Sequence, residues 1–190
     1  MRKKSVEKEE KIKKTVIKLT REFGFQGISM SKIANECGIS PSSIYTYYNS
    51  KSEMIHSIYH EIREKRFRDI VEQVDSSIVE KVTLYEIFRG YYFYLIGNED
   101  EYYFIKQFSS CPCLIEEIKL KKYEISESSV IDKFIKDKKI IDFDKGILHS
   151  LLASPIERMA ENYYIHGTLL NEKEVKFTFD LIWKGICNNS

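Results

Sequence analysis

The fold is decided by residues 28–54, which read ISMSKIANECGISPSSIYTYYNSKSEM. The first half of this stretch predicts a short helix over residues 29–37, because its apolar residues recur at helical spacing. Ser29 stands where an N-cap is needed, and its hydroxyl can accept a backbone N–H. Gly38 can adopt the positive φ angle that commonly ends a helix.

The second half predicts another short helix, over residues 40–47. Ser40 is its N-cap candidate, and Pro41 suits its first turn. Two short helices joined by a glycine-containing turn form a helix-turn-helix unit, whose second helix lies in the major groove of DNA. An ordinary helical hairpin in a small bundle is the alternative, and the spacing alone does not exclude it.

The rest of the chain also has helical patterns and no alternating strand pattern. An amphipathic helix precedes the helix-turn-helix and is expected to end at Gly24, and Ser50 is expected to cap a long helix that reaches about residue 74. We therefore expect an all-α fold, in which a three-helix DNA-binding domain is joined by a long helix to a larger helical domain. Further helices are expected over roughly residues 81–97, 99–110, 114–138, 144–166 and 172–188.

The charge is unevenly distributed, although the 190-residue chain as a whole carries a net charge of only +1. Residues 1–51 contain 11 Lys or Arg and 5 Asp or Glu, a balance of +6, and residues 52–190 have a balance of −5. This asymmetry indicates that the N-terminal part binds a polyanion, although a solvated charged helix would give the same count. Together with the small hydroxylated face of the second helix, it favours DNA binding. We expect the domain boundary at residue 51.

Composition and motifs exclude several other classes of protein. No apolar run approaches the length of a membrane span, and the charged N-terminus does not read as a secretory signal, so we expect a cytoplasmic protein with no membrane partner. The sequence has no glycine-rich phosphate loop, no H-E-x-x-H motif and no nucleophile elbow. We therefore expect no enzyme activity, no catalytic or metal-binding residues and no cofactor.

Residues 28–54 resemble the DNA-binding signature of TetR-type (tetracycline-repressor-like) transcriptional regulators, and this signature covers about a quarter of the chain. The resemblance implies a homodimeric repressor that binds a palindromic operator and is released by a small apolar or aromatic effector. A constitutive nucleoid-associated protein of the same fold, without an effector, is the alternative. The matching elements are Ile33-Ala34, Gly38-Ile39-Ser40, Ile44-Tyr45, Tyr48, Lys51 and the preceding Phe23–Gly27.

The same resemblance implies which residues contact DNA. By position, two serines match the start of the family's second helix, four residues match its recognition helix, and Tyr45 and Lys51 match phosphate contacts. Pro41 stands where the family often has Lys or Arg, so we expect an A·T-rich operator read through hydroxyls, Tyr47 and DNA shape. The full predicted set is Ser29, Ser31, Pro41, Ser42, Ser43, Tyr45, Thr46, Tyr47 and Lys51.

Aromatic residues make up 13% of the chain and are dense between residues 85 and 108. Most are expected in the core, but the many tyrosines also suit an apolar pocket with a polar rim. We expect a flat or elongated apolar effector there, with a cation among the alternatives. The candidate residues are His60, Tyr85, Phe88, Tyr92, Tyr103, Phe104 and Phe108.

The last two expected helices carry apolar stripes. The resemblance implies that they pair with their two-fold copies in a four-helix interface, but such stripes also serve the core of one chain, and the sequence leaves both uses open. The candidate dimerisation residues are Leu148, Leu152, Ile156, Met159, Phe179, Ile182, Trp183 and Ile186.

Two small groups of residues have alternative interpretations. His56, His60 and Glu64 lie one helical turn apart and could face a metal ion together, but surface histidines are the favoured interpretation. Cys111 and Cys113 could form a thiol-sensing pair, but with one residue between them a disulfide would be strained. A loop at this point of the chain is the preferred interpretation.

Overall fold

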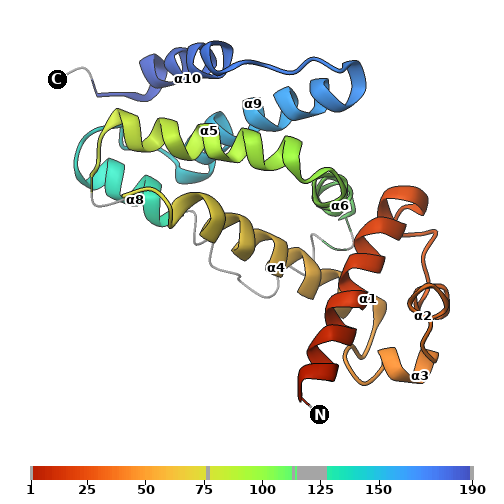
Figure 1. The fold of residues 1–190 in the computed structure, drawn as a ribbon. Coiled ribbons are helices and arrows are strands. Elements are labelled where there is room, and N and C mark those ends of the chain that lie inside the picture. The colour runs from red at the N-terminus through yellow and green to blue at the C-terminus, as the bar shows by residue number, and fades with distance from the viewer. Residues whose placement is uncertain (1, 76–77, 113, 115–127, 189–190) are drawn as a thin grey trace. The chain divides into compact units, whose positions relative to one another are not determined.

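A computed structural model describes residues 2–75, 78–112, 114 and 128–188 and divides into two compact units (Figure 1). Unit 1 contains the described residues of Met1–Arg63 and Glu99–Tyr123, and unit 2 those of Glu64–Asn98 and Glu124–Ser190. The described residues form nine helices, no strand and one isolated β-bridge. The all-α fold is therefore confirmed, and no helix among these residues is long and apolar enough to cross a bilayer.

Unit 1 is a helical bundle built around the predicted helix-turn-helix. Its core is apolar and draws side chains from every helix of the unit, with Ile12, Ile33, Ile44, Met54 and Phe104 fully buried. Its elements are α1 (Arg2–Phe23), α2 (Met30–Cys37), α3 (Pro41–Ile44), the first part of α4 (Lys51–Val71) and α6 (Glu99–Ser109).

Helix α6 belongs to unit 1, although it lies far along the chain. Gln107 of α6 accepts a hydrogen bond from the Phe25 backbone N–H at 3.2 Å and donates one to the Thr20 carbonyl at 2.9 Å. Arg21 at the end of α1 pairs with Glu99 at 2.6 Å and Asp100 at 2.8 Å. These bonds fasten the C-terminal end of α1, where Gly24 has a φ of 67° and ends the helix as predicted.

Unit 2 contains the remainder of α4 and four further helices. Asp144 caps α9 and Asn171 caps α10, where Glu174 completes a reciprocal capping box. The C-terminal end of α10 is held by the single β-bridge, which joins Ile140 to Cys187. The other helices of the unit are α5 (Lys81–Gly97), α8 (Ser128–Lys136), α9 (Lys145–His166) and α10 (Glu172–Ile186).

The predicted helix bounds agree with the structure within a few residues for most elements. The second helix of the helix-turn-helix is shorter than expected, because α3 is regular only over Pro41–Ile44 and continues as a turn. Much of the helix expected over 114–138 lies outside the described residues. The compact units divide α4 after Arg63, not at residue 51, so the functional boundary expected at residue 51 stays a prediction.

Candidate nucleic-acid interface and internal cavity

The helix-turn-helix has the local chemistry that its sequence predicts. The Ser29 hydroxyl accepts the Lys32 backbone N–H at 3.2 Å, which caps α2. Gly38 has a φ of 64°, and the N–H groups of Gly38 and Ile39 bond the carbonyls of Asn35 and Ala34 at 3.0 Å. This pair of bonds satisfies carbonyls that the end of a helix leaves unpaired, and it turns the chain sharply into α3.

A network of hydroxyls organises the start of α3. The Ser40 Oγ lies 2.9 Å from the Ser42 Oγ and 2.8 Å from the Ser43 Oγ, and it accepts the Ser43 backbone N–H at 3.3 Å. The Thr46 hydroxyl donates to the Ser43 carbonyl at 2.7 Å. Because that bond uses the only proton of the hydroxyl, Thr46 can offer a base its oxygen lone pairs and its methyl group.

Most of the residues predicted to contact DNA are exposed. Ser43 and Tyr47 are half-buried, and Tyr47 packs partly against the core of unit 1. Tyr45 is 54% exposed, which is unusual for a large aromatic side chain. The six exposed members of the predicted set are Ser29, Ser31, Pro41, Ser42, Tyr45 and Thr46.

Lys51, the ninth predicted contact, has partners inside unit 1. Its ammonium donates to the carbonyl of Phe25 at 2.8 Å and to that of Ile28 at 3.1 Å. Both carbonyls belong to the segment that links α1 to α2, so the first residue of α4 fastens that link. The structure thus shows Lys51 holding the link between α1 and α2, and its contact with a DNA phosphate stays a prediction.

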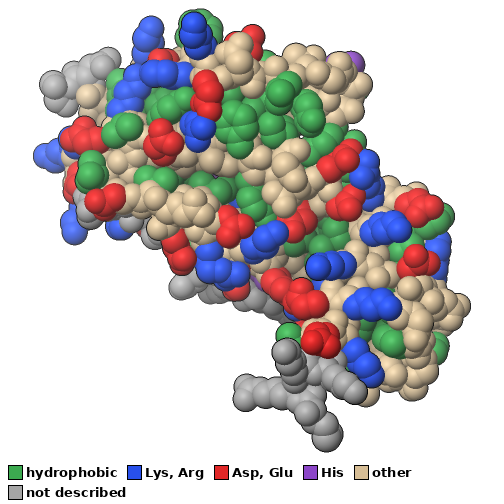
Figure 2. All heavy atoms as spheres, in the orientation of Figure 1, with side chains coloured by type: hydrophobic (Ala, Val, Ile, Leu, Met, Phe, Trp, Pro, Cys, Tyr) green, Lys and Arg blue, Asp and Glu red, His purple; other side chains and the backbone are tan. Residues whose placement is uncertain are grey.

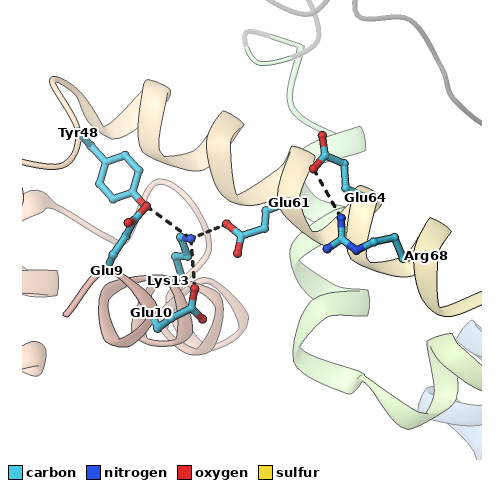
Figure 3. Close-up of polar contacts among 7 residues, drawn as sticks. All are labelled: Glu9, Glu10, Lys13, Tyr48, Glu61, Glu64 and Arg68. Carbon is cyan, nitrogen blue, oxygen red and sulfur yellow. Dashed lines mark hydrogen bonds and ion pairs between the residues drawn. The ribbon is translucent and has the colours of Figure 1, made fainter. Parts of the chain in front are cut away.

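A second lysine, Lys13, lies at the centre of a polar cluster in unit 1 (Figure 3). The Lys13 ammonium lies 2.6 Å from a carboxylate oxygen of Glu61, 3.3 Å from Glu10 and 3.5 Å from Glu9, whose carboxylate also accepts the Tyr48 hydroxyl at 3.5 Å. Burial alone would lower the pKa of Lys13, but the bonds and negative charge of Glu61, with Glu10 and Glu9, raise it. Burial, with the charge of Glu9, raises the pKa of Tyr48. The cluster thus ties α1 to the turn after α3 and to α4.

Unit 2 contains a cavity of about 90 Å³ with almost entirely apolar walls. Helix α4 contributes Arg66 and three apolar neighbours, and the other walls come from α5, α8 and α9. The lining residues are Arg66, Phe67, Ile70, Val71, Leu84, Ile87, Phe88, Tyr91, Val130, Ile131, His149, Leu152, Ala153 and Ile156.

The charged residue of the cavity wall is buried. Arg66 is 7% exposed, and its Nη1 donates to the Tyr91 hydroxyl at 3.0 Å while its guanidinium lies 4.4 Å from the centre of the Tyr91 ring. The Tyr91 hydroxyl in turn donates to the exposed Glu157 carboxylate at 3.2 Å. A hydrogen-bonded chain thus runs from the cavity wall to the surface of unit 2.

The seven predicted effector residues are not gathered in one place. Of the seven, only Phe88 lines the cavity, and Tyr92 is buried with its hydroxyl accepting the Leu170 backbone N–H at 3.1 Å. Tyr85 packs on Phe179, with ring centroids 5.5 Å apart. The other four belong to unit 1, where Phe104 packs on Phe25, Phe108 stacks on Tyr59, Tyr103 lies beside Arg21 and His60 beside Tyr59.

The predicted dimerisation residues are mostly used by the core of unit 2. Leu148, Ile156, Met159, Phe179 and Ile186 are buried within one chain, while Leu152, Ile182 and Trp183 are half-buried. A different set of apolar side chains faces outward, and Figure 2 shows hydrophobic side chains at the surface over α9 and α10. The exposed members are Ile147, Leu151, Ile165, Phe177 and Leu181, which are 45–65% exposed.

The structure tests the suggested metal site of the histidines and the suggested thiol pair of the cysteines only in part. His56 is 3% exposed and is not a surface histidine, and its ring nitrogens lie 2.8 Å from the Ser52 carbonyl and 3.1 Å from the Leu114 carbonyl. The described part of the chain contains no group of three potential ligands that could hold a metal ion. Cys111 is half-buried, and Cys113 lies outside the described residues, so the suggested pair is not tested.

Arg66 and Gln107 have roles that the sequence analysis missed. Arg66 lies four residues from both Ile62 and Ile70, which are buried, so it interrupts the apolar stripe of α4. An arginine at such a position is a signal of a buried charge that could have been detected. Gln107 gave no comparable signal, because its partners are backbone groups distant in sequence.

Comparisons with known proteins agree with a helix-turn-helix in the N-terminal part of the chain. Residues 15–58 match the family model described as bacterial regulatory proteins, tetR family. A segment of 51 residues, 27% of the chain and 18% of its relative, is 41% identical to the uncharacterized HTH-type transcriptional regulator YerO of Bacillus subtilis (strain 168). The chain covers about a fifth of the length of the curated relatives it matches.

The similarity of fold extends over the whole chain. A putative tetR family transcription regulator from Shewanella sp. PV-4 superposes with a TM-score of 0.83 at 16% identity, over 96% of this chain and 99% of that one. A TetR family transcription regulator from Marinobacter aquaeolei VT8 gives a TM-score of 0.81 at 14% identity, over all of both chains. At these identities the likeness concerns the fold alone.

Proposed function

We propose that the chain, whose residues 15–58 match the model of the tetR family of bacterial regulatory proteins, acts in the cytoplasm as a homodimeric repressor of that family, released from a palindromic operator by a small effector. This is a family of regulators and not of enzymes, which agrees with the expectation of no catalytic site. The observation that carries the proposal is the capped helix-turn-helix, with exposed hydroxyls and an exposed tyrosine at the start of α3.

The proposed DNA surface consists of the exposed side chains of the helix-turn-helix. Ser42 and Thr46 lie near base edges in the major groove, and Tyr45 reaches the backbone from the turn after α3. No Lys or Arg lies on α3, so the strong bidentate contact to guanine is missing there, and an A·T-rich operator remains our proposal. We assign Lys51 a positioning role behind this surface.

The proposed dimer face consists of the outward apolar side chains of α9 and α10. Ile147 and Leu151 are one turn apart on α9, and Phe177 and Leu181 are one turn apart on α10. Exposed apolar patches of this kind commonly mark contacts between proteins. This set replaces the buried residues of the predicted stripe, because side chains already packed in one chain cannot also pack against a second copy.

Substitution of Leu181 tests the dimer face. Leu181→Glu places a charge where the second copy would pack, so we expect monomers in sedimentation at micromolar concentration, with unchanged helix content by circular dichroism. Val6→Glu is the matched control, because Val6 is 53% exposed on α1. A dimeric Leu181→Glu variant, or a monomeric wild-type protein, would refute this part of the proposal.

DNA binding is tested with a negative charge on the proposed recognition surface. Operator sequences are first selected from a random DNA pool, and affinities are then measured by fluorescence anisotropy. Ser42→Asp adds a carboxylate near the N-terminus of α3, a position that suits an acidic residue, so the fold should persist. We expect at least roughly a 100-fold loss of affinity, because like charges across an interface repel strongly. Ser57→Asp, at an exposed position of α4, is the control.

The anisotropy experiment also separates the repressor from the nucleoid-associated alternative. A repressor should select one palindromic sequence and release it when an effector is added, whereas a constitutive binder should select none or show no release by any compound. The cavity of unit 2 favours the repressor, since α4 forms part of its wall and is the same helix that begins at Lys51. Unchanged binding by Ser42→Asp would contradict the proposed recognition surface.

A further inference from the structure

We propose that the cavity of unit 2 binds a compact, uncharged and wholly apolar molecule, such as a small hydrocarbon, and that this molecule is the effector. The inference rests on the proposed function, because it assigns a chemical class to the effector of that function. It is carried by the wall of the cavity, which brings together side chains from four helices and presents almost no polar surface.

The wall of the cavity consists mainly of hydrocarbon side chains. Of the fourteen described residues that line it, eleven are aliphatic residues or phenylalanine. None of the fourteen is an exposed residue, so the wall lies within the packed helices of unit 2. A ligand in this cavity would transfer its apolar surface from water to carbon, which is the main source of affinity that such a wall offers.

The three polar residues of the wall, Arg66, Tyr91 and His149, border the cavity with their carbon atoms, because almost none of its surface is polar. The Arg66 guanidinium donates to the Tyr91 hydroxyl at 3.0 Å, and that hydroxyl donates to the Glu157 carboxylate at 3.2 Å. These groups are thus engaged with one another and with the surface of unit 2. A polar group of a ligand would therefore lose its hydrogen bonds to water and gain almost none from the described wall, which carries a desolvation cost.

The same wall disfavours a ligand charge of either sign. No Asp or Glu is among the described residues that line the cavity, so a cation would have no acidic partner there. An acid would lose its hydration without gaining a charged bond, because the guanidinium of Arg66 is not presented to the cavity. The cationic effector that the tyrosine-rich sequence left open is therefore disfavoured, and an uncharged molecule is the class that the wall accepts.

The volume of the cavity limits the size of the ligand. Water is a poor occupant of an apolar cavity, because a buried water molecule needs about two to four polar partners. An apolar cavity of about 150 Å³ binds benzene or xenon. The cavity of unit 2 is smaller, at about 90 Å³, so we expect a xenon atom to fit without movement of the wall and a single benzene ring to be the upper limit. A fused pair of rings would displace the wall, which lowers affinity.

Calorimetric titration of the full chain tests the chemical class with four molecules that share one benzene ring. We expect benzene to bind at least about tenfold more tightly than phenol, because the phenol hydroxyl would be desolvated without a partner. Benzoate and benzylamine should bind more weakly still, since each carries a full charge. The rise in Tm with each compound is an independent measure, because a ligand of the folded state stabilises it. Phenol, benzoate or benzylamine binding as tightly as benzene would overturn the inference.

Xenon separates the chemical class of the ligand from its size. It is a single uncharged atom without hydrogen-bonding groups, and its binding is followed by the chemical shift of dissolved xenon in NMR titrations of the full chain. Saturable binding of xenon together with benzene supports the inference at the proposed size. Binding of xenon without benzene supports the apolar class and places the size limit below one ring. If neither binds, the inference is overturned.

Substitutions on α9 locate the ligand in the cavity. Ala153→Leu places a larger side chain in the wall and should weaken the binding of benzene at least about tenfold, whereas Ser154→Leu, at the neighbouring exposed position, should not. If Ala153→Leu does not fold, Leu152→Ala enlarges the cavity instead and should strengthen the binding of naphthalene relative to the wild type. Benzene binding that Ala153→Leu retains, or naphthalene binding that Leu152→Ala leaves unchanged, would overturn the location.

The outcomes for the cavity and for the proposed function are distinguished by separate measurements. If the cavity binds neither xenon nor benzene, the inference fails, while operator selection and the Leu181→Glu variant still decide the proposed function. If the protein selects no operator, the proposed function and the effector role fail together, and calorimetry still decides the apolar class. Operator release is measured by anisotropy, where we expect release by benzene and not by benzoate. Benzene that binds without releasing the operator overturns its role as an effector.

Discussion

Lys51 allows a direct test of whether a basic residue next to the proposed DNA surface contacts phosphate or supports that surface. Lys51→Met keeps most of the aliphatic stem and removes the ammonium that bonds the Phe25 and Ile28 carbonyls at 2.8 and 3.1 Å. If positioning is its role, the variant should lose stability, and its affinity for DNA should keep the same dependence on salt.

The magnitude follows from the two bonds. A hydrogen bond from a charged donor contributes about 1.5 to 3 kcal/mol, and the half-exposed site lets water replace part of it, so we expect a total loss of about 2 kcal/mol. For a chain of this size, about 1 kcal/mol corresponds to roughly 2 to 4 °C in Tm, so the midpoint should fall by about 4 to 8 °C. Lys14→Met, at an exposed position of α1, should change the unfolding free energy by less than about 0.5 kcal/mol.

The assay combines thermal unfolding with anisotropy titrations at several salt concentrations. Each phosphate contact contributes about 0.9 to the slope of log K against log salt concentration, so loss of one contact per subunit would flatten the slope by about 2 for a dimer. We expect the slope of Lys51→Met to match that of the wild type. An unchanged Tm together with a slope flattened by about 2 would refute the positioning role and establish the phosphate contact.

Three further predictions concern the stability of each unit. Gly38→Ala should lower the free energy of unfolding by about 1 to 2 kcal/mol in thermal unfolding, because Gly38 has a φ of 64°, which alanine adopts at a cost. A Cβ at Gly38 would meet no atom within 4 Å, so the loss would come from the backbone alone. Gly97→Ala is the control, because the space there is also open and φ is not positive, and it should be neutral or stabilising. Lys13→Met should lower the free energy of unfolding by about 1 to 2 kcal/mol, because it removes the ion pair with Glu61. Lys18→Met, at an exposed position of α1, should leave the free energy of unfolding nearly unchanged. Hydrogen bonds from Lys81 lower the pKa of Asp180, and hydrogen bonds from Arg89 lower the pKa of Glu172, so both pairs stabilise unit 2 at neutral pH. This stabilisation is lost as the pH falls below about 4.5 and the carboxylates take up protons. The variant Asp180→Asn should therefore show a smaller fall of Tm in acid.

The features predicted correctly from sequence are those that a few neighbouring residues determine. Ser29 and Ser40 cap their helices, and Gly24 and Gly38 end theirs with positive φ, because these roles depend on local backbone geometry. The order and approximate bounds of the helices followed from apolar spacing in the same way. Helix α3 is about half as long as predicted, since the chain turns after Ile44 to bring Tyr48 into the core.

Features that depend on contacts between distant segments were not predictable in the same way. Aromatic density made Phe104 and Phe108 candidates for an effector pocket, and it did not show that they would pack with α1 and α4 in the core of unit 1. Apolar spacing identified the stripes of α9 and α10, but not which of their apolar residues would remain exposed. Leu148 and Leu151 have the same chemistry, yet one is fully buried and the other is 45% exposed. A periodic pattern identifies an apolar face and does not identify its partner.

The contacts within unit 1 restrict how an effector could reduce DNA binding. Gln107 fastens the end of α1, and Lys51 fastens the link from α1 to α2. Lys13 connects α1 with Glu61 of α4, and Glu9 of α1 accepts the hydroxyl of Tyr48 after α3. A ligand in unit 2 would have to break several of these bonds to distort the recognition surface itself, whereas a change in α4 beyond Glu61 would break none of them. We therefore expect the effector to act on the spacing of two intact recognition surfaces in a dimer, which requires only that the ligand prefer one dimer geometry over the other.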